Sequence, residues 1–120
     1  MIMQAKPLVL IVGVCASGKT TLAGGLQELG YNASSFAQEH SVTPFVWRHK
    51  KPDFLIFLIC KYETIKNRKN INWGYSEYLR QVDWLNDAYK HAHLVVVTDV
   101  FTPEELIRHV DSLLRHRALR

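Results

Sequence analysis

The chain has 120 residues, 48% of them hydrophobic and 22% charged, and this composition predicts one packed globular domain over residues 1–120. It excludes a disordered or fibrous protein, and two cysteines are too few for a disulfide framework. With no apolar stretch long enough for a bilayer and no signal-peptide pattern, we expect a cytoplasmic protein without membrane contact. The net charge of +4 permits a nucleic-acid partner, but the basic residues are scattered and such a partner is not favoured.

A phosphate-binding loop pattern follows the first predicted strand. An apolar run over about residues 7–12 predicts a buried strand, and leucines at helical spacing predict a helix over about 18–29 that Gly30 ends. Between them the pattern G-x-x-x-x-G-K-[ST] is matched by Gly13-Val14-Cys15-Ala16-Ser17-Gly18-Lys19-Thr20, with Thr21 next to it. Such a loop wraps phosphate in backbone N–H groups at a helix N-terminus. Lys19 is then expected on the β/γ-phosphates and the Thr20 hydroxyl on Mg²⁺.

Further along the chain, strand and helix patterns alternate. After a weak second strand over about 31–36 we expect a short helix over about 44–50, and then a strand over 53–60 that is buried on both faces. Helices are predicted at about 63–68 and from Ser76 to Ala92, and a last strand at 94–98. The residues Thr102-Pro103-Glu104-Glu105 read as a capping box that opens a final helix.

This alternation predicts an α/β fold, a three-layer αβα sandwich with a small open parallel sheet of about four strands. Ligands of such sheets bind beyond the carboxyl ends of the strands. The residues that follow each strand are therefore the candidates for function. A sheet this small has exposed edges, and a homodimer that covers one of them is possible.

Three stretches of the chain resemble the small-molecule and nucleotide kinases of the P-loop NTPase superfamily, and they are residues 13–21, 52–68 and 94–105. The resemblance implies a P-loop NTPase fold, ATP or another NTP with Mg²⁺ as cofactor, and transfer of the γ-phosphoryl group to an unidentified small acceptor. It also implies that Lys19 is catalytic, that Arg68 closes over the phosphates from a lid, and that Glu39 touches the acceptor or the metal.

The chain is shorter than these kinases, and the missing length lies between the first helix and Asp53. The strand at 54–59 ends in Cys60-Lys61 and offers no Walker B aspartate, so Asp99 after the last strand is the second metal candidate beside Thr20. The histidines at 49, 91, 93, 109 and 116 show no zinc-ligand spacing, and we predict no zinc site. Arg80 is a weaker candidate for phosphate contact than Arg68.

Two other functions are compatible with these residues. A nucleotide-binding switch or slow NTPase without a phospho-acceptor fits the shortened middle of the chain. A nucleic-acid-associated NTPase fits the basic charge, and it would show a steep dependence of binding on salt. A small kinase is the favoured interpretation.

Overall fold

The structure, a computed structural model, describes residues 6–117 and contains one parallel sheet. Its strands are β1 (Leu8–Gly13), β2 (Asn32–Ser35), β3 (Phe54–Ile59) and β4 (Leu94–Val97), in the spatial order β2-β1-β3-β4. All three strand pairs are parallel. The central strands β1 and β3 are the two apolar runs of the sequence, and both are buried on both faces as expected. This confirms the α/β class and the four-stranded parallel sheet.

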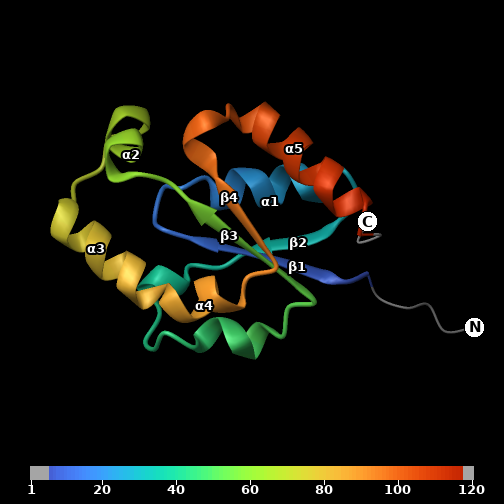
Figure 1. The fold of residues 1–120 in the computed structure, drawn as a ribbon, viewed down its shortest axis with the longest axis horizontal. Helices are drawn as coiled ribbons and strands as arrows, with labels where there is room; N and C mark the ends of the chain where they lie inside the picture. The colour runs from blue at the N-terminus through green and yellow to red at the C-terminus, as the bar shows by residue number, and fades with distance from the viewer. Residues whose placement is uncertain (1–5, 118–120) are drawn as a thin grey trace, which may run out of the picture.

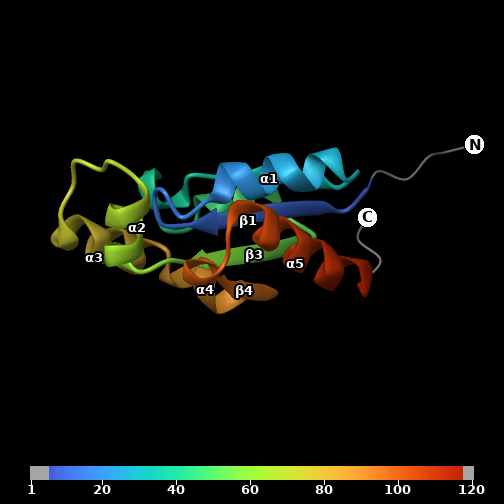
Figure 2. The same cartoon turned by 90° about the horizontal axis from the view of Figure 1, so that it is seen from above.

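Helices cover both faces of this sheet (Figure 1). On one face lie α1 (Lys19–Glu28) and α5 (Pro103–Arg115), and on the other α2 (Tyr62–Arg68), α3 (Tyr75–Trp84) and α4 (Asn86–His91) contribute to a second apolar cluster. Figure 2 shows α2 and α3 gathered at the end of the molecule to which β1 and β3 point. The arrangement is compatible with the predicted three-layer sandwich. No helix within residues 6–117 is long and apolar enough to cross a membrane.

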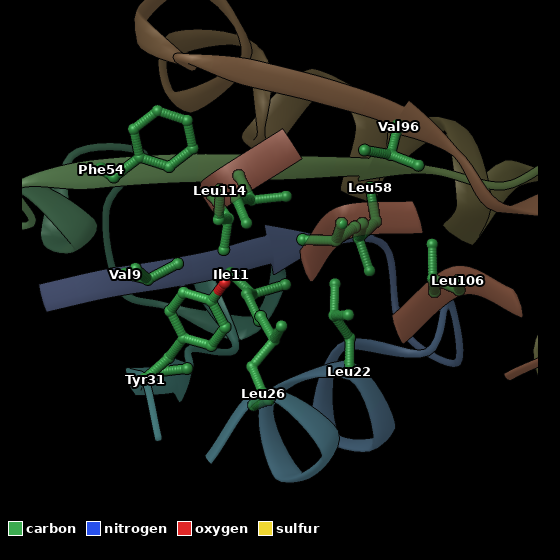
Figure 3. Close-up of a cluster of buried hydrophobic side chains, with 14 residues drawn as sticks. Val9, Ile11, Leu22, Leu26, Tyr31, Phe54, Leu58, Val96, Leu106 and Leu114 are labelled. Atoms are coloured by element: carbon green, nitrogen blue, oxygen red, sulfur yellow. The ribbon is translucent and has the colours of Figure 1, made fainter. Parts of the chain in front are cut away.

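The core between the sheet and the pair α1 and α5 follows from the alternation of side chains along the strands (Figure 3). Val9 and Ile11 of β1 face this cluster, whereas Leu10 and Val12 face the opposite one. The helices add apolar side chains at helical spacing, namely Leu22 and Leu26 from α1 and Leu106, Val110 and Leu114 from α5. Helices therefore cover both faces of the central strands β1 and β3.

Local signals in the sequence set the ends of α1 and α5. The last turn of α1 closes as a Schellman motif, because Gly30 has a φ of 99° and the N–H groups of Gly30 and Tyr31 donate to Gln27 and Leu26. At the start of α5 the Thr102 hydroxyl accepts the Glu105 N–H, and the Glu105 carboxylate accepts the Thr102 N–H. Both the glycine stop and the capping box are confirmed.

Two of the predicted helices differ in the structure from what the sequence indicates. The segment expected as a helix over 44–50 is a 3-10 helix, η2 (Val46–Lys50), and the Gln38 side chain holds this segment by accepting the Trp47 N–H and donating to the Thr43 carbonyl. The helix expected from Ser76 to Ala92 is broken at Leu85 into α3 and α4. There the Leu85 N–H is shared between the carbonyls of Gln81 and Val82, a bifurcation common where helices end.

Among the described residues, β4 pairs with β3 alone and forms an edge of the sheet. The side chains of Val95 and Val97, which point to the face opposite Val96, are 41% and 44% exposed. The strand carries no lysine, glutamate or proline of the kind that protects edges from pairing. A possible homodimer that covers an edge of the sheet stays a prediction.

Two adjacent glycines in α1 allow a test of the contact between α1 and α5. A Cβ on Gly24 would meet nothing within 4 Å, so Gly24→Ala should stabilise the protein by about 0.5–1 kcal/mol through helix propensity. A Cβ on Gly25 would lie 2.4 Å from Cδ1 and 2.6 Å from Cγ1 of Ile107 on α5. Gly25→Ala should therefore be about 1–3 kcal/mol less stable than Gly24→Ala in urea unfolding. Equal stability of the two variants would show that α5 does not pack this closely on Gly25.

Candidate functional site

The first candidate region lies where the connections of the sheet diverge. After β1 the chain turns to α1 on one face, and after β3 it turns to α2 on the other. β2 and β3 flank β1 on opposite sides, which makes the carboxyl ends of β1 and β3 a topological switch point. In open α/β sheets this crevice is where ligands bind. The loop over 14–18 lies at this point.

Close packing and an unusual backbone shape this loop. Gly13 pairs with Leu58 of β3, and a Cβ on Gly13 would lie 2.7 Å from the Leu58 carbonyl oxygen and 2.9 Å from Ser17 Oγ. Only glycine fits there. Gly18 has a φ of 104° and Ala16 a φ of 68°, so a non-glycine residue is held in the left-handed region within the loop. Such conformations cost free energy and concentrate at binding sites.

The loop presents unused hydrogen-bond donors at the N-terminus of α1. The backbone N–H groups of Gly18, Lys19 and Thr20 donate to no other residue within the described part of the chain. Ser17 Oγ is buried in the same loop and has no partner. Because the helix dipole adds partial positive charge at this end, the arrangement suits an anion.

Lys19 and Glu39, two of the predicted catalytic residues, form a buried ion pair. Lys19 is 9% and Glu39 1% exposed, and Lys19 Nζ lies 2.6 Å from Glu39 Oε2. Glu39 belongs to the 3-10 helix η1 (Gln38–His40), which follows β2. The Lys19 ammonium also donates to the carbonyls of Gly13 at 2.8 Å and Val14 at 3.0 Å. The ammonium is thus held inside the loop by Glu39 and by two backbone carbonyls.

Residues of α3 hold the loop from the opposite side. The Cys15 N–H donates to Gln81 Oε1 at 2.8 Å, and Gln81 Nε2 donates to Glu77 Oε2 at 2.9 Å. Arg80 binds Glu77 and also donates to the Glu39 carbonyl at 3.2 Å. Hydrogen bonds from Arg80 and then Gln81 lower the pKa of Glu77 to about 2. Helix α3 is therefore tied both to the loop and to Glu39.

Gln81 was not anticipated from the sequence. It is fully buried, and it lies between Tyr78 and Leu85 at the spacing of the apolar face of α3. A glutamine among apolar positions of an amphipathic helix signals a buried polar group that needs a partner. That signal pointed to Gln81 but not to its partner, the Cys15 N–H.

Arg68 lies at the end of α2 with its guanidinium turned toward the segment after β4. It donates to the carbonyls of Thr98 at 3.1 Å, Asp99 at 2.8 Å and Phe101 at 3.2 Å. Arg68 also lines a pocket of about 410 Å³ next to the loop. Its predicted role over the phosphates stays a prediction, since the guanidinium is bound to these carbonyls in the structure.

The two predicted metal ligands are not brought together. Asp99 Oδ1 accepts the Lys61 N–H at 3.0 Å and the Thr64 hydroxyl at 2.6 Å, where α2 begins. Although burial opposes ionisation, these hydrogen bonds hold the pKa of Asp99 below its usual value. Thr20 is exposed at the start of α1, and no interaction within residues 6–117 joins it to Asp99. A metal site of Thr20 with Asp99 stays a prediction.

The pocket beside the loop is large enough for a small organic ligand. Its volume of about 410 Å³ lies in the range of ligand sites. The loop and the start of α1 form one end, and the other residues come from the end of α2, the connection after β4 and the start of α5. The lining side chains nearest to this argument are Thr21, Arg68, Phe101 and Pro103. The unused N–H donors of the loop thus adjoin a pocket that contains the aromatic ring of Phe101.

A comparison of the sequence with models of known protein families gives no match, and a comparison with curated proteins gives none either. The resemblance to nucleotide and small-molecule kinases therefore rests on the three stretches of sequence that carry it.

Proposed function

We propose that the chain is a protein of P-loop NTPase fold that binds ATP or another NTP with Mg²⁺ and transfers the γ-phosphoryl group to a small acceptor. The observation that carries the proposal is the loop at the switch point, where the N–H groups of Gly18, Lys19 and Thr20 have no other partner and the carbonyls of Gly13 and Val14 hold the Lys19 ammonium in the same loop. Phosphoryl transfer depends mainly on positioning and on neutralising the charge of the phosphates. The loop supplies both.

The triphosphate and the nucleoside are assigned to adjoining parts of the site. The N–H groups of Gly18, Lys19 and Thr20 take the phosphate oxygens, and Lys19 exchanges Glu39 for the β/γ-phosphates. The base occupies the pocket between Arg68 and Phe101. This places the reacting phosphate near η1, the segment that carries Glu39.

The residues near the loop fit Mg²⁺, which prefers oxygen ligands. The Thr20 hydroxyl is exposed next to Lys19, and Glu39 Oε1 is a buried carboxylate oxygen without a partner. Bound Mg²⁺ would neutralise charge on the β- and γ-phosphate oxygens. Glu39 has two possible roles here, to orient the metal or to receive the proton of the acceptor hydroxyl.

Phe101→Ala separates base binding from phosphate binding. Loss of a stacked aromatic partner should weaken ATP binding by about 1–3 kcal/mol, which is a rise in Kd of about 5- to 150-fold. Inorganic tripolyphosphate has no base, so its affinity for the same variant should be unchanged. Both affinities are measured by calorimetry, and the tripolyphosphate arm also shows that the variant is folded. An equal loss of affinity for ATP and for tripolyphosphate would show that the base does not bind in this pocket.

A slow NTPase or nucleotide-dependent switch is the second candidate, and one observation favours it. Between α1 and β3 the described chain forms only β2 and two 3-10 helices, which leaves little structure for an acceptor site. ATP turnover with and without a panel of small hydroxyl compounds distinguishes the candidates. Turnover that requires an acceptor supports the kinase, whereas equal hydrolysis in its absence supports the NTPase. A nucleic-acid-associated NTPase rests on net charge alone.

A further inference from the structure

Three side chains of the kinds that bind transition metals meet beside the loop. Cys15 comes from the loop after β1, and Glu39 and His40 come from η1 after β2. The possible ligand atoms of these residues all lie within 4.8 Å of one another. They converge because β1 and β2 are parallel neighbours. The segments that leave the carboxyl ends of these two strands therefore lie at the same end of the sheet.

The carboxylate of this group has an oxygen that the protein does not satisfy. Glu39 is 1% exposed, and its Oε2 accepts from Lys19 at 2.6 Å. Its Oε1 is buried and has no hydrogen-bond partner. An unsatisfied buried oxygen on a charged group is costly, and a cation would relieve that cost. This observation is independent of the clustering of the three residues.

We propose that Cys15, Glu39 and His40 form a site for a borderline divalent cation of the Zn²⁺ class. Sulfur, nitrogen and carboxylate oxygen together select Zn²⁺ over Mg²⁺ and Ca²⁺, which prefer oxygen alone. Three protein ligands leave a fourth position for water, as in open zinc sites. The His40 side chain is 49% exposed, so the ion has access from solvent.

Binding requires only a small adjustment of these residues. Metal–ligand bonds of about 2.0–2.3 Å in a tetrahedron place ligand atoms about 3.3–3.8 Å apart. The three ligand atoms lie within 4.8 Å of one another, so their separations have to shorten by at most about 1–1.5 Å, and rotation of the exposed His40 side chain contributes to this.

The charges around the group are compatible with a cation. The positive groups that face it are Lys19, through Glu39 Oε2, and Arg80, through the Glu39 carbonyl. Arg80 is already paired with Glu77. Cys15 binds metal as a thiolate, so Glu39 and Cys15 together supply two negative charges to a divalent ion. Glu39 Oε2 lies 2.6 Å from Lys19 Nζ and 3.8 Å from His40 Nε2, so in the nucleotide-free chain the carboxylate can bind the ion while Lys19 keeps its two carbonyl partners.

The site is tested with the untagged chain and Co²⁺, a spectroscopic substitute for Zn²⁺, in the absence of nucleotide. We expect a thiolate-to-cobalt charge-transfer band that saturates at a single ion per chain and is displaced by Zn²⁺ but not by excess Mg²⁺. Cys15→Ser should abolish the band. His40→Asn should weaken binding at least about tenfold, since changes around metal ligands already cost that much.

Two matched variants control for the other cysteine and for other histidines. Cys60→Ser removes the buried cysteine that follows β3, and His49→Asn removes a histidine of η2. Both variants should bind Co²⁺ as the unmodified chain does. No charge-transfer band, or a band that survives Cys15→Ser, would overturn the proposal. Co²⁺ affinity unchanged in His40→Asn would overturn it as well. Because no nucleotide is present, these outcomes leave the proposed nucleotide function untouched.

Discussion

Lys19→Ala should weaken the binding of Mg²⁺-ATP by about 2–3 kcal/mol, a rise in Kd of about 30- to 150-fold. The ammonium is expected to make charge-assisted hydrogen bonds to the β/γ-phosphates, and each such bond to a charged group contributes about 1.5–3 kcal/mol. The structure holds this ammonium within the loop, on the Gly13 and Val14 carbonyls. Isothermal titration calorimetry measures the change.

Lys90→Ala is the matched control for this measurement. Lys90 is exposed on α4 and takes no part in the loop, so its removal should leave ATP affinity unchanged. A thermal melt of both variants shows whether each is folded under the titration conditions. If a folded Lys19→Ala protein binds ATP as tightly as the unmodified chain, the loop does not carry the phosphates.

The second large effect concerns stability and needs no ligand. Lys19→Met leaves the Glu39 carboxylate buried without its cation, and removal of one partner from a buried pair costs about 3–5 kcal/mol. Glu39→Gln should cost less, because Lys19 keeps the carbonyls of Gly13 and Val14. Urea unfolding of each variant gives the two free energies of unfolding. The contacts in the structure thus predict a larger loss of stability for Lys19→Met than for Glu39→Gln.

The double variant Lys19→Met with Glu39→Gln completes a mutant cycle. It buries neither charge, so it should be more stable than Lys19→Met alone, with a coupling of about 0.5–3 kcal/mol between the two sites. Glu28→Gln, on an exposed carboxylate at the end of α1, is the control and should change little. Additive losses in the double variant would mean that Lys19 and Glu39 do not interact in solution.

The parts of the fold that could be predicted are those whose signals are local. The apolar runs predicted β1 and β3, and the capping box at Thr102 predicted the start of α5. The break at Leu85 could not be predicted, because a single residue between α3 and α4 does not disturb the apolar spacing. The 3-10 form of η2 and the hydrogen bonds that the Gln38 side chain makes with this segment could not be predicted either, since no periodicity reveals them.

In the candidate site, too, some residues could be predicted from local signals in the sequence and others could not. The motif located the loop and Lys19, and the position of Glu39 after the second strand made it a candidate. That the two side chains meet depends on β2 pairing directly with β1, which is a property of the sheet and not of either segment. The convergence of Cys15 with His40 has the same origin, and the sequence gives no spacing that would indicate it.

Titration of the unmodified chain with ATP and with GTP, with and without Mg²⁺, tests the central claim most directly. The loop at the switch point predicts saturable binding of one nucleotide per chain for at least one of the two, tighter with Mg²⁺ than without. If neither nucleotide binds in either condition, the loop is not a nucleotide site, and the kinase and the NTPase are both wrong.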